Sequence, residues 1–437
     1  MWVVDPTSMH MRWPAFAALA ALAGTAAAAG VAYQSARARP RIEREVPWAS
    51  SGIWLKAETH VHSKFSDGGS TVDELVDRAV TNGCDVLAIT DHTDGDLKAA
   101  TPEYHAAIAS ARARVPKLVL ITGIEWNVPP GKGQDHAVVL FPPEMDNAVM
   151  TGEFKNRFDD QLKEGENPEL AVAAFEWLRQ KSSGASAMPV VFLDHPSRKA
   201  KDLASVRAEI ERLSEIGGEM FAGVEGAPGH QNQASLGAYG GPLLPEDRWD
   251  PAIAPPGAIW DHLLAAGSLK SGALATSDFH GTDNGDYWPG EFSATWIYAP
   301  DRSIQGVLRA LHAGSFVGVH GGIARRVELL VSTDGVPRPA VPGERLHVPA
   351  GRKVSIELRA EIPSTDWQGQ PNHVDLVELL GVTASGTTVL RAGPFDNGVF
   401  RHELVVPSGG IAIRARGRRV VDNGPDLLFY TNAVQVR

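Results

Sequence analysis

The sequence predicts an α/β barrel followed by a smaller domain made only of β-strands. From Trp54 to His320, short apolar strands alternate with amphipathic helical stretches in roughly seven strand–helix units, a pattern typical of a barrel built on parallel strands. After about residue 325 the helical period disappears, and short strands are separated by Gly, Pro and Asp turns, which favours a small β-sandwich. These changes divide the chain into a leader (1–33), a linker (34–52), the barrel (53–325) and the all-β domain (326–437).

The N-terminal segment looks like a targeting sequence rather than part of the fold. Residues 14–33 carry no charge and are rich in alanine, shortly after Arg12. An apolar stretch followed by small residues predicts a cleaved signal peptide, and therefore an exported protein that is periplasmic or secreted. Because about 20 apolar residues can just span a bilayer, an uncleaved membrane anchor is the first alternative. A true start at Met9 or Met11 is the second.

Composition excludes several classes of function. Hydrophobic residues make up 43% of the chain and charged residues 21%, as expected of a soluble globular protein. The net charge of −11, without a long basic run in the folded part, argues against binding of long nucleic acids. Cys84 is the single cysteine, so neither an internal disulfide nor thiolate-bound zinc is expected. We expect Cys84 to be a small buried apolar residue.

The elements of the barrel follow one another with recognisable boundaries. The stretch 71–83 predicts a helix, because Thr71 and Glu74 have the spacing of a capping box and Gly83 is a natural stop. The near-continuous apolar run 85–92 predicts a strand buried on both faces. The other predicted strands are 54–62, 118–126, 136–141, 189–195, 221–226, 272–280, 295–300 and 315–320, and the other predicted helices are 102–115, 168–182, 201–216, 257–267 and 303–314. In the all-β domain the predicted strands are 326–333, 353–362, 374–382, 387–393, 401–407, 411–420 and 432–437.

Histidines and carboxylates gather where these barrel strands end. In barrels of parallel strands the chemistry lies at the carboxyl ends of the strands. Side chains two residues apart on a strand share a face, so His60 and His62 can reach one metal region, as can Asp278 and His280. Imidazole suits zinc, iron and manganese, carboxylates can bridge two cations, and bound cations lower the pKa of a coordinated water. Any one of these residues alone would be interpreted as structural, but their joint occurrence predicts catalytic metals.

The motifs HVHSKFSDG, LAITDH, GIE, DHAVVL, DHPSR and TSDFHG resemble, in order, those of the polymerase-and-histidinol-phosphatase (PHP) metallohydrolases, over roughly residues 53–325. The resemblance implies a distorted seven-stranded (β/α)7 barrel that holds two or three divalent ions, Zn, Mn or Fe. Asp67 stands where some members have a third histidine, which leaves the identity of the metal open. The implied metal ligands are His60, His62, Asp67, His92, Glu125, His136, His195, Asp278 and His280.

A second resemblance concerns the end of the barrel and the tail. LRALHAGSFVGVHGG and the final FYTNAVQVR are similar to the carbaryl-hydrolase-like (CehA/McbA) branch of the same superfamily. Asn432-Ala433 departs from the Asn-Pro of that branch. The resemblance implies cleavage of esters or carbamates as an alternative to phosphoesters.

We therefore expect a metal-dependent hydrolase that uses a metal-bridging hydroxide, with small phosphoesters or short nucleotides as the favoured substrates. The alternatives are a carboxylester, carbamate or amide hydrolase, and a non-catalytic metal-binding protein. Arg198 could hold a phosphate bidentately, or could be a surface arginine that starts the next helix. Asp194 and Asp91 each precede a ligand histidine and point away from it, so orientation of the site is expected of both and proton transfer is a further option for Asp194. We expect a small-molecule partner, and contact with a membrane only if the leader is uncleaved.

Other residues near these motifs have two interpretations each. Glu225 and His230 either line the substrate pocket or belong to a plain loop. Trp126, Tyr287 and Trp288 either wall a pocket for an organic substrate or simply pack. The all-β domain is expected to cover a face or edge of the barrel. His262, His312 and His320 have no partners at strand ends and are expected to be structural.

Overall fold

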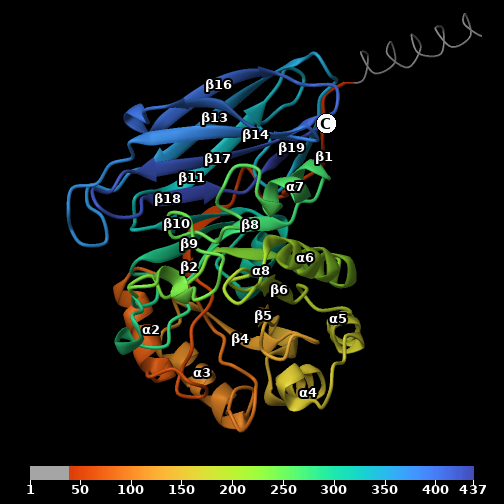
Figure 1. Ribbon diagram of the computed structural model, residues 1–437, viewed down its shortest axis with the longest axis vertical. Helices are drawn as coiled ribbons and strands as arrows, with labels where there is room; N and C mark the ends of the chain where they lie inside the picture. The colour runs from red at the N-terminus through yellow and green to blue at the C-terminus, as the bar shows by residue number, and fades with distance from the viewer. Residues whose placement is uncertain (1–38) are drawn as a thin grey trace, which may run out of the picture.

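The computed structural model describes residues 39–437 and shows an α/β part carrying a β-rich part at one end (Figure 1). The C-terminus lies in the β-rich part. The leader predicted over residues 1–33 lies outside the described residues. Every helix that the structure describes is too short or too polar to cross a bilayer.

The barrel strands form one curled sheet in the order β10-β9-β2-β3-β4-β5-β6-β7-β8. This arrangement confirms the predicted α/β class. The sheet curls far enough that β8 meets β9 through the Thr295 hydroxyl, which donates to the Ala275 carbonyl (2.8 Å) and accepts from the Ala275 N–H (2.9 Å). The strands are β2 (Ile53–Glu58), β3 (Val86–Ile89), β4 (Val119–Asn127), β5 (His136–Leu140), β6 (Val190–Leu193), β7 (Phe221–Ala227), β8 (Ser271–Ala275), β9 (Ser293–Ala299) and β10 (Phe316–His320).

The expectation that the barrel strands are all parallel is wrong for two of them. Strands β2, β3 and β4 are parallel, as are β6, β7 and β8. Strand β5 is antiparallel to both of its neighbours, because residues 128–135 are too short for the crossover that a parallel strand needs. Strand β9 is antiparallel to both β2 and β10.

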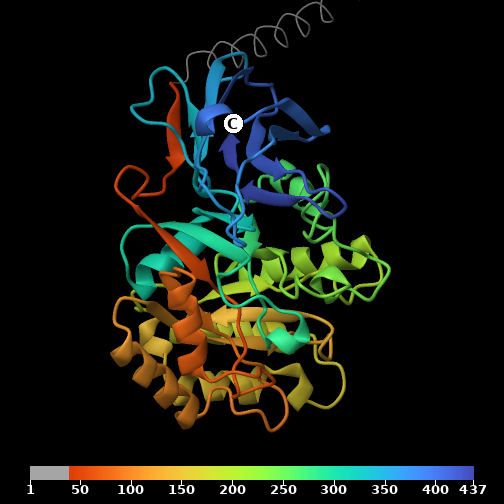
Figure 2. The same ribbon diagram turned by 90° about the vertical axis from the view of Figure 1, so that its left-hand side faces the viewer.

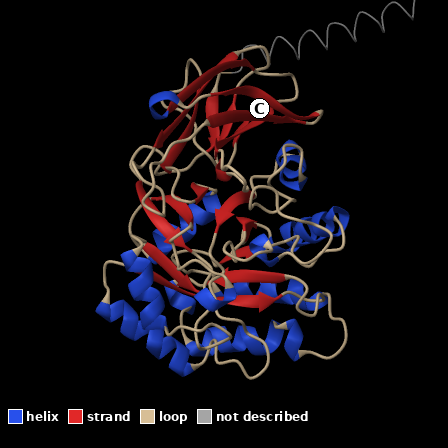
Figure 3. Cartoon of the chain, turned by 60° about the vertical axis from the view of Figure 1, so that its left-hand side comes forward, coloured by secondary structure: helices blue, strands red, loops and turns tan. Residues whose placement is uncertain are grey.

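The helices lie outside the curled sheet (Figure 3). The predicted capping box is present, since Thr71 accepts from the Glu74 N–H and the Glu74 carboxylate accepts from the Thr71 N–H. Helix α4 was not expected, and its Phe154 and Phe158 pack with Trp126 in the core of the barrel. The helices are α2 (Val72–Thr81), α3 (Pro102–Arg114), α4 (Ala148–Phe158), α5 (Glu169–Lys181), α6 (Leu203–Gly217), α7 (Ile259–Ala265) and α8 (Ile304–Ala313).

The β-rich part contains two packed sheets around a second core (Figure 2). Along β13 the apolar Val354, Ile356 and Leu358 alternate with more exposed residues, so one face of the strand is buried. One sheet contains β11 (Arg325–Ser332), β13 (Lys353–Glu361) and β16 (Val399–Val405). The other contains β1 (Arg41–Arg44), β12 (Arg345–His347), β14 (Leu376–Thr383), β15 (Gly386–Gly393), β17 (Ile411–Arg419), β18 (Leu427–Thr431) and β19 (Val434–Val436).

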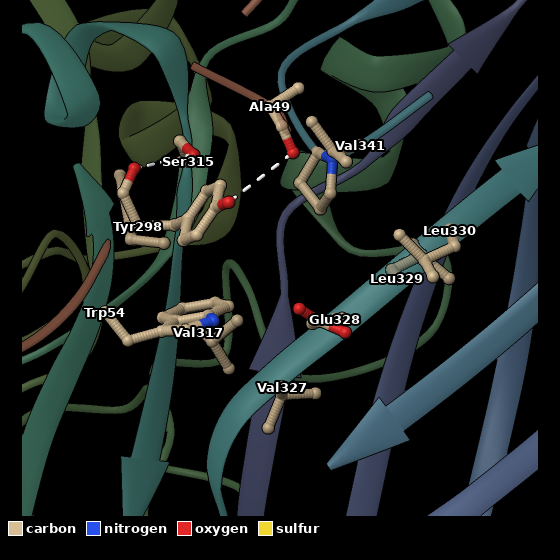
Figure 4. Close-up of a pocket in the computed structure, with 12 residues that line it drawn as sticks. Ala49, Trp54, Tyr298, Ser315, Val317, Val327, Glu328, Leu329, Leu330 and Val341 are labelled. Atoms are coloured by element: carbon tan, nitrogen blue, oxygen red, sulfur yellow. Dashed lines mark hydrogen bonds between the residues drawn. The ribbon is translucent and has the colours of Figure 1, made fainter. Parts of the chain in front are cut away.

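The two parts of the molecule share backbone hydrogen bonds. Strand β18 pairs antiparallel with β10, so the sheet of the barrel continues into the β-rich part. Strand β1 lies within the segment 34–52, where a linker was predicted, and pairs with β12. A cavity of about 410 Å³ lies at this junction, between Trp54 and Tyr298 of the barrel and Glu328 of β11 (Figure 4). None of the predicted site residues lines this cavity.

Candidate metal centre

The nine predicted ligands converge at one end of the curled sheet. Because β2, β3, β6 and β8 run in the same direction, the residues that follow them meet at one edge. His136 reaches this edge for the opposite reason: it is the first residue of β5, which runs antiparallel to β4. The topology therefore explains why a residue that begins a strand joins residues that end strands.

Glu125 lies at the centre of the cluster and is 1% exposed. Its Oε2 lies 3.1 Å from His62 Nε2 and 3.1 Å from His92 Nδ1. Its Oε1 accepts from His136 Nδ1 at 2.7 Å and lies 3.4 Å from His195 Nε2. Its Oε2 also lies 3.4 Å from His60 Nε2, so one carboxylate contacts five histidines that come from four different segments of the chain.

Asp278 forms a second focus beside Glu125. Its Oδ1 lies 3.3 Å from His62 Nε2 and 3.4 Å from His60 Nε2. The two histidine nitrogens are themselves 3.1 Å apart, which confirms that His60 and His62 face the same region. His280 lies next to Asp278, with Nδ1 3.6 Å from Oδ1.

Asp67 completes the group from a loop. Its carboxylate is 51% exposed and lies 3.4 Å from His280 Nε2 and 3.7 Å from His92 Nε2. The loop folds back tightly at Gly68, where a Cβ atom would lie 2.3 Å from the His62 carbonyl oxygen. Asp91 holds the start of this loop by accepting hydrogen bonds from the Ser63 N–H and Oγ, which matches the orienting position expected of Asp91.

The donor set fits divalent cations. Glu125 Oε2 and Asp278 Oδ1 are buried oxygens without a hydrogen-bond partner among the described residues. His60, His62, Glu125 and Asp278 each offer an atom within 4.8 Å of the others, and so do His62, Asp67, His92 and His280. Nitrogen and oxygen ligands of this kind suit zinc, manganese and iron, and a cation would satisfy the unpartnered oxygens.

The electrostatics of the site show how concentrated its negative charge is. Burial alone would lower the pKa of His60, but Glu225, Asp278 and Glu125 raise it well above its usual value. Burial also opposes protonation of His62, yet Asp278 and Glu125 raise the pKa of that imidazole to about 10. The buried carboxylates therefore favour positive charge at this place, which bound cations would supply.

Arg198 lies beside Asp278 rather than on the surface. Its side chain is 10% exposed, Nη1 donates to Asp278 Oδ2 at 2.8 Å, and Nε donates to the Gly237 carbonyl at 2.9 Å. Nη2 is buried and has no partner among the described residues. The burial contradicts the surface alternative, and the free Nη2 leaves a donor for an anion.

Asp194 is buried next to the cluster. Its carboxylate has an oxygen within 4.8 Å of donor atoms of His60 and Glu225, and neither oxygen has a hydrogen-bond partner among the described residues. Burial, followed by the charge of Glu225, raises the pKa of Asp194 well above its usual value. A role in proton transfer stays a prediction.

Sequence reasoning missed part of the polar network behind the ligands. Glu225 lies within β7 rather than in a loop; it accepts from His60 Nδ1 at 2.7 Å and from the His195 N–H at 3.1 Å. The available signal was an acidic residue inside the apolar strand FAGVEG, at the end where the other strands carry ligands. His230 bridges Asp278 and Asp286, with nitrogen–oxygen distances of 3.2 and 2.5 Å. Asp286 lies in a loop, and no sequence pattern distinguishes it.

Substitution of Glu225 by glutamine is expected to weaken metal binding about 10- to 100-fold. The amide keeps the size of the side chain but loses the charge that orients His60 and raises its basicity. A competition titration with a chromophoric chelator measures the affinity. Glu403→Gln is the matched control, because that side chain is 67% exposed and faces Lys353. Equal affinities of the two variants would show that Glu225 does not support His60.

Comparison with known proteins finds similarity in part of the chain. The sequence profile of the PHP domain matches residues 58–225. A 3',5'-nucleoside bisphosphate phosphatase of Chromobacterium violaceum is 35% identical over 95 residues, which is 22% of this chain and 30% of that relative's length.

Two solved structures are also similar. A two-domain protein of Bacteroides vulgatus, described as containing a predicted PHP-like metal-dependent phosphoesterase, is 19% identical, with 91% of this chain and 99% of that chain covered and a TM-score of 0.42. An amidohydrolase of Chromobacterium violaceum with bound sulfate is 19% identical, with 51% of this chain and 87% of that chain covered and a TM-score of 0.29. The profile match includes the segments that carry His60, His92, Glu125, His136 and His195. The chain therefore contains a PHP domain, over residues 58–225.

Proposed function

We propose that the protein is a metal-dependent phosphoesterase acting on small phosphoesters or short nucleotides. The observation that carries the proposal is the contact of one buried carboxylate, Glu125, with five histidines from four separate segments, beside an arginine with an unpartnered nitrogen. The partial similarity to a nucleoside bisphosphate phosphatase supports a phosphoester rather than another substrate.

The chain's own residues suit this chemistry. His60, His62, Asp67, His92, Glu125, His136, His195, Asp278 and His280 would hold the metals. When bound, divalent cations lower the pKa of a coordinated water and neutralise the charge that develops on the scissile group. Arg198 Nη2 would donate to a phosphate oxygen, while Asp278 and the Gly237 carbonyl fix the guanidinium in place. Lys199, whose Nζ lies 3.4 Å from His136 Nε2, adds a second positive charge at the same edge.

Three chromogenic substrates test this proposal on the purified protein: p-nitrophenyl phosphate, bis-p-nitrophenyl phosphate and p-nitrophenyl acetate. We expect turnover of at least one phosphoester, loss of that turnover on chelation, and recovery with zinc, manganese or iron. Metal-dependent cleavage of the acetate alone would overturn the proposal in favour of an ester or carbamate hydrolase. Bound metal without turnover of any of the three would favour a non-catalytic protein.

A further inference from the structure

A second polar pocket lies at the opposite end of the barrel from the metal centre. Its volume is about 830 Å³, and it lies where β6, β7 and β8 begin, whereas the metal centre lies where they end. Its polar lining consists of Arg44, Glu219, Ser268, Lys270 and His312. In barrels of this kind the end at which strands begin carries stability rather than catalysis. A ligand here would therefore be distinct from the substrate.

Arg44 lines this pocket and is opposed by a second arginine, Arg345, on the neighbouring strand. Arg44 on β1 is the register partner of Arg345 on β12, and like charges directly opposite across antiparallel strands destabilise the pair. Among the described residues neither guanidinium forms an ion pair with a carboxylate, and Arg345 Nε is buried without a partner. Burial lowers the pKa of Arg44, the charge of Glu219 raises it, and the neighbouring Arg345 lowers it. Two arginines thus lie side by side with an acidic residue nearby but without an ion pair among the described residues.

Lys270 adds a third cation. Its ammonium donates to the carbonyls of Gly218 and Phe221 and lies 5.8 Å from the centre of the Phe221 ring. Burial, followed by the charge of Arg44, lowers the pKa of Lys270 to about 8. The charge of Glu219 offsets part of this lowering, but among the described residues no carboxylate forms an ion pair with the ammonium.

His312 points to the same conclusion by its hydrogen bonds. Its Nδ1 lies 3.0 Å from the Glu219 carbonyl and its Nε2 lies 3.3 Å from the Met188 carbonyl. Carbonyl oxygens only accept, and a neutral imidazole has a single N–H, so both contacts are hydrogen bonds only in the protonated ring. Burial lowers the pKa of His312, so without a ligand the neutral ring makes only one of these two hydrogen bonds. A negative charge in the pocket would favour the protonated ring, which makes both. The one carboxylate in the lining, Glu219, is exposed.

We infer that this pocket binds a small multivalent oxyanion of the phosphate or diphosphate type, held by Arg44 and Lys270 with Arg345 beside them. Guanidinium groups bind such anions through paired hydrogen bonds, and the anion would relieve the repulsion between the two arginines. Arg44 and Arg345 belong to the sheet of the β-rich part, whereas Lys270 and His312 belong to the barrel. The bound anion would therefore join the two parts and stabilise the native state by mass action. The inference is independent of the proposed function.

Isothermal titration of the full chain with pyrophosphate, at constant ionic strength and after removal of metals, tests the site. We expect saturable binding and a rise in the melting temperature with pyrophosphate concentration. Arg44→Met and Lys270→Met should each weaken binding by about tenfold or more, because each removes a charged hydrogen-bond donor. Arg41→Met is the matched control: Arg41 lies on the same strand, is 58% exposed and pairs with Glu43, so that variant should bind as the wild type does.

Two further arms locate the binding and its source. Pyrophosphate should bind equally well to His60→Ala, and loss of binding in that variant would place the anion at the metal centre and overturn the inference. Vesicles that contain phosphatidylglycerol should not displace pyrophosphate from the protein. If the protein bound these vesicles but not pyrophosphate, the inference that the ligand is a free anion would be wrong. Circular dichroism of Arg44→Met and Lys270→Met separates lost binding from lost folding. Unchanged affinity in both folded variants would likewise overturn the site.

Discussion

Replacement of His60 by alanine is expected to remove bound metal and to lower phosphoester turnover by more than about 100-fold. Loss of a residue that only supports a ligand already costs about 10- to 100-fold, and His60 is a predicted ligand. The side chain is fully buried and contacts His62, Glu225 and Asp278, so its removal leaves carboxylates that no nearby imidazole compensates. Elemental analysis of the purified variant, together with turnover of p-nitrophenyl phosphate, measures both effects.

The control for this experiment is His373→Ala. The His373 side chain is 58% exposed and faces only Asp375, far along the chain from the cluster, so metal content and turnover should stay at the wild-type level. A folded His60→Ala variant that keeps its full metal content and activity would contradict the assignment of the metal centre. A variant that loses turnover but keeps the metal would show that His60 contributes to activity without being a metal ligand.

The candidate site could be predicted because its signals are local. Each of His60, His92 and His195 closely follows an apolar strand, and a barrel brings the ends of parallel strands together whatever the sequence between them. The helix that begins after Thr71 could be predicted for the same reason, since its capping box lies within four consecutive residues.

Contacts that depend on distant pairing could not be predicted. Glu225 meets His60 only because the sheet curls, and His230 meets Asp286 only because two loops converge. The junction of the two parts depends on the pairing of β10 with β18, which lie more than a hundred residues apart and carry no local signal for each other. The direction of β5 was the exception: the short connection over residues 128–135 contained the information, but a regular strand–helix alternation was assumed instead.

This junction contains the ion pair on which we expect stability to depend most. Arg414 of β17 is fully buried; its Nε and Nη2 donate to the two carboxylate oxygens of Asp261 in α7 at 2.7 and 2.9 Å. The guanidinium lies over the ring of Trp260, 4.7 Å from its centre. Asp261 also accepts from the Gly257 N–H and the Thr387 hydroxyl, so the pair links the barrel to two strands of the β-rich part.

Arg414→Met is expected to lower the free energy of unfolding by about 3–5 kcal/mol, measured by urea denaturation at neutral pH. The loss is large because the Asp261 carboxylate stays buried without its counter-ion. Arg207→Met is the control, because Arg207 pairs with Glu211 while 50% exposed, and the loss there should stay within about 1 kcal/mol.

The pH dependence of stability and a double variant distinguish the contribution of the Arg414 charge from that of its packing. Burial would raise the pKa of Asp261, but Arg414 lowers it below its usual value, so the pair stabilises the wild type above the unfolded pKa of about 3.9. This stabilisation is lost as the pH falls through the lower pKa of the folded state. In Arg414→Met the lone buried carboxylate takes up a proton more readily, so the difference in stability between the variant and the wild type should narrow as the pH falls.

The addition of Asp261→Asn to Arg414→Met should recover part of the lost stability at neutral pH, because no buried charge then remains without a partner. The single variant Asp261→Asn is measured as well. If the double variant lost as much unfolding free energy as the two single variants lose together, packing of the arginine stem rather than charge would account for the effect.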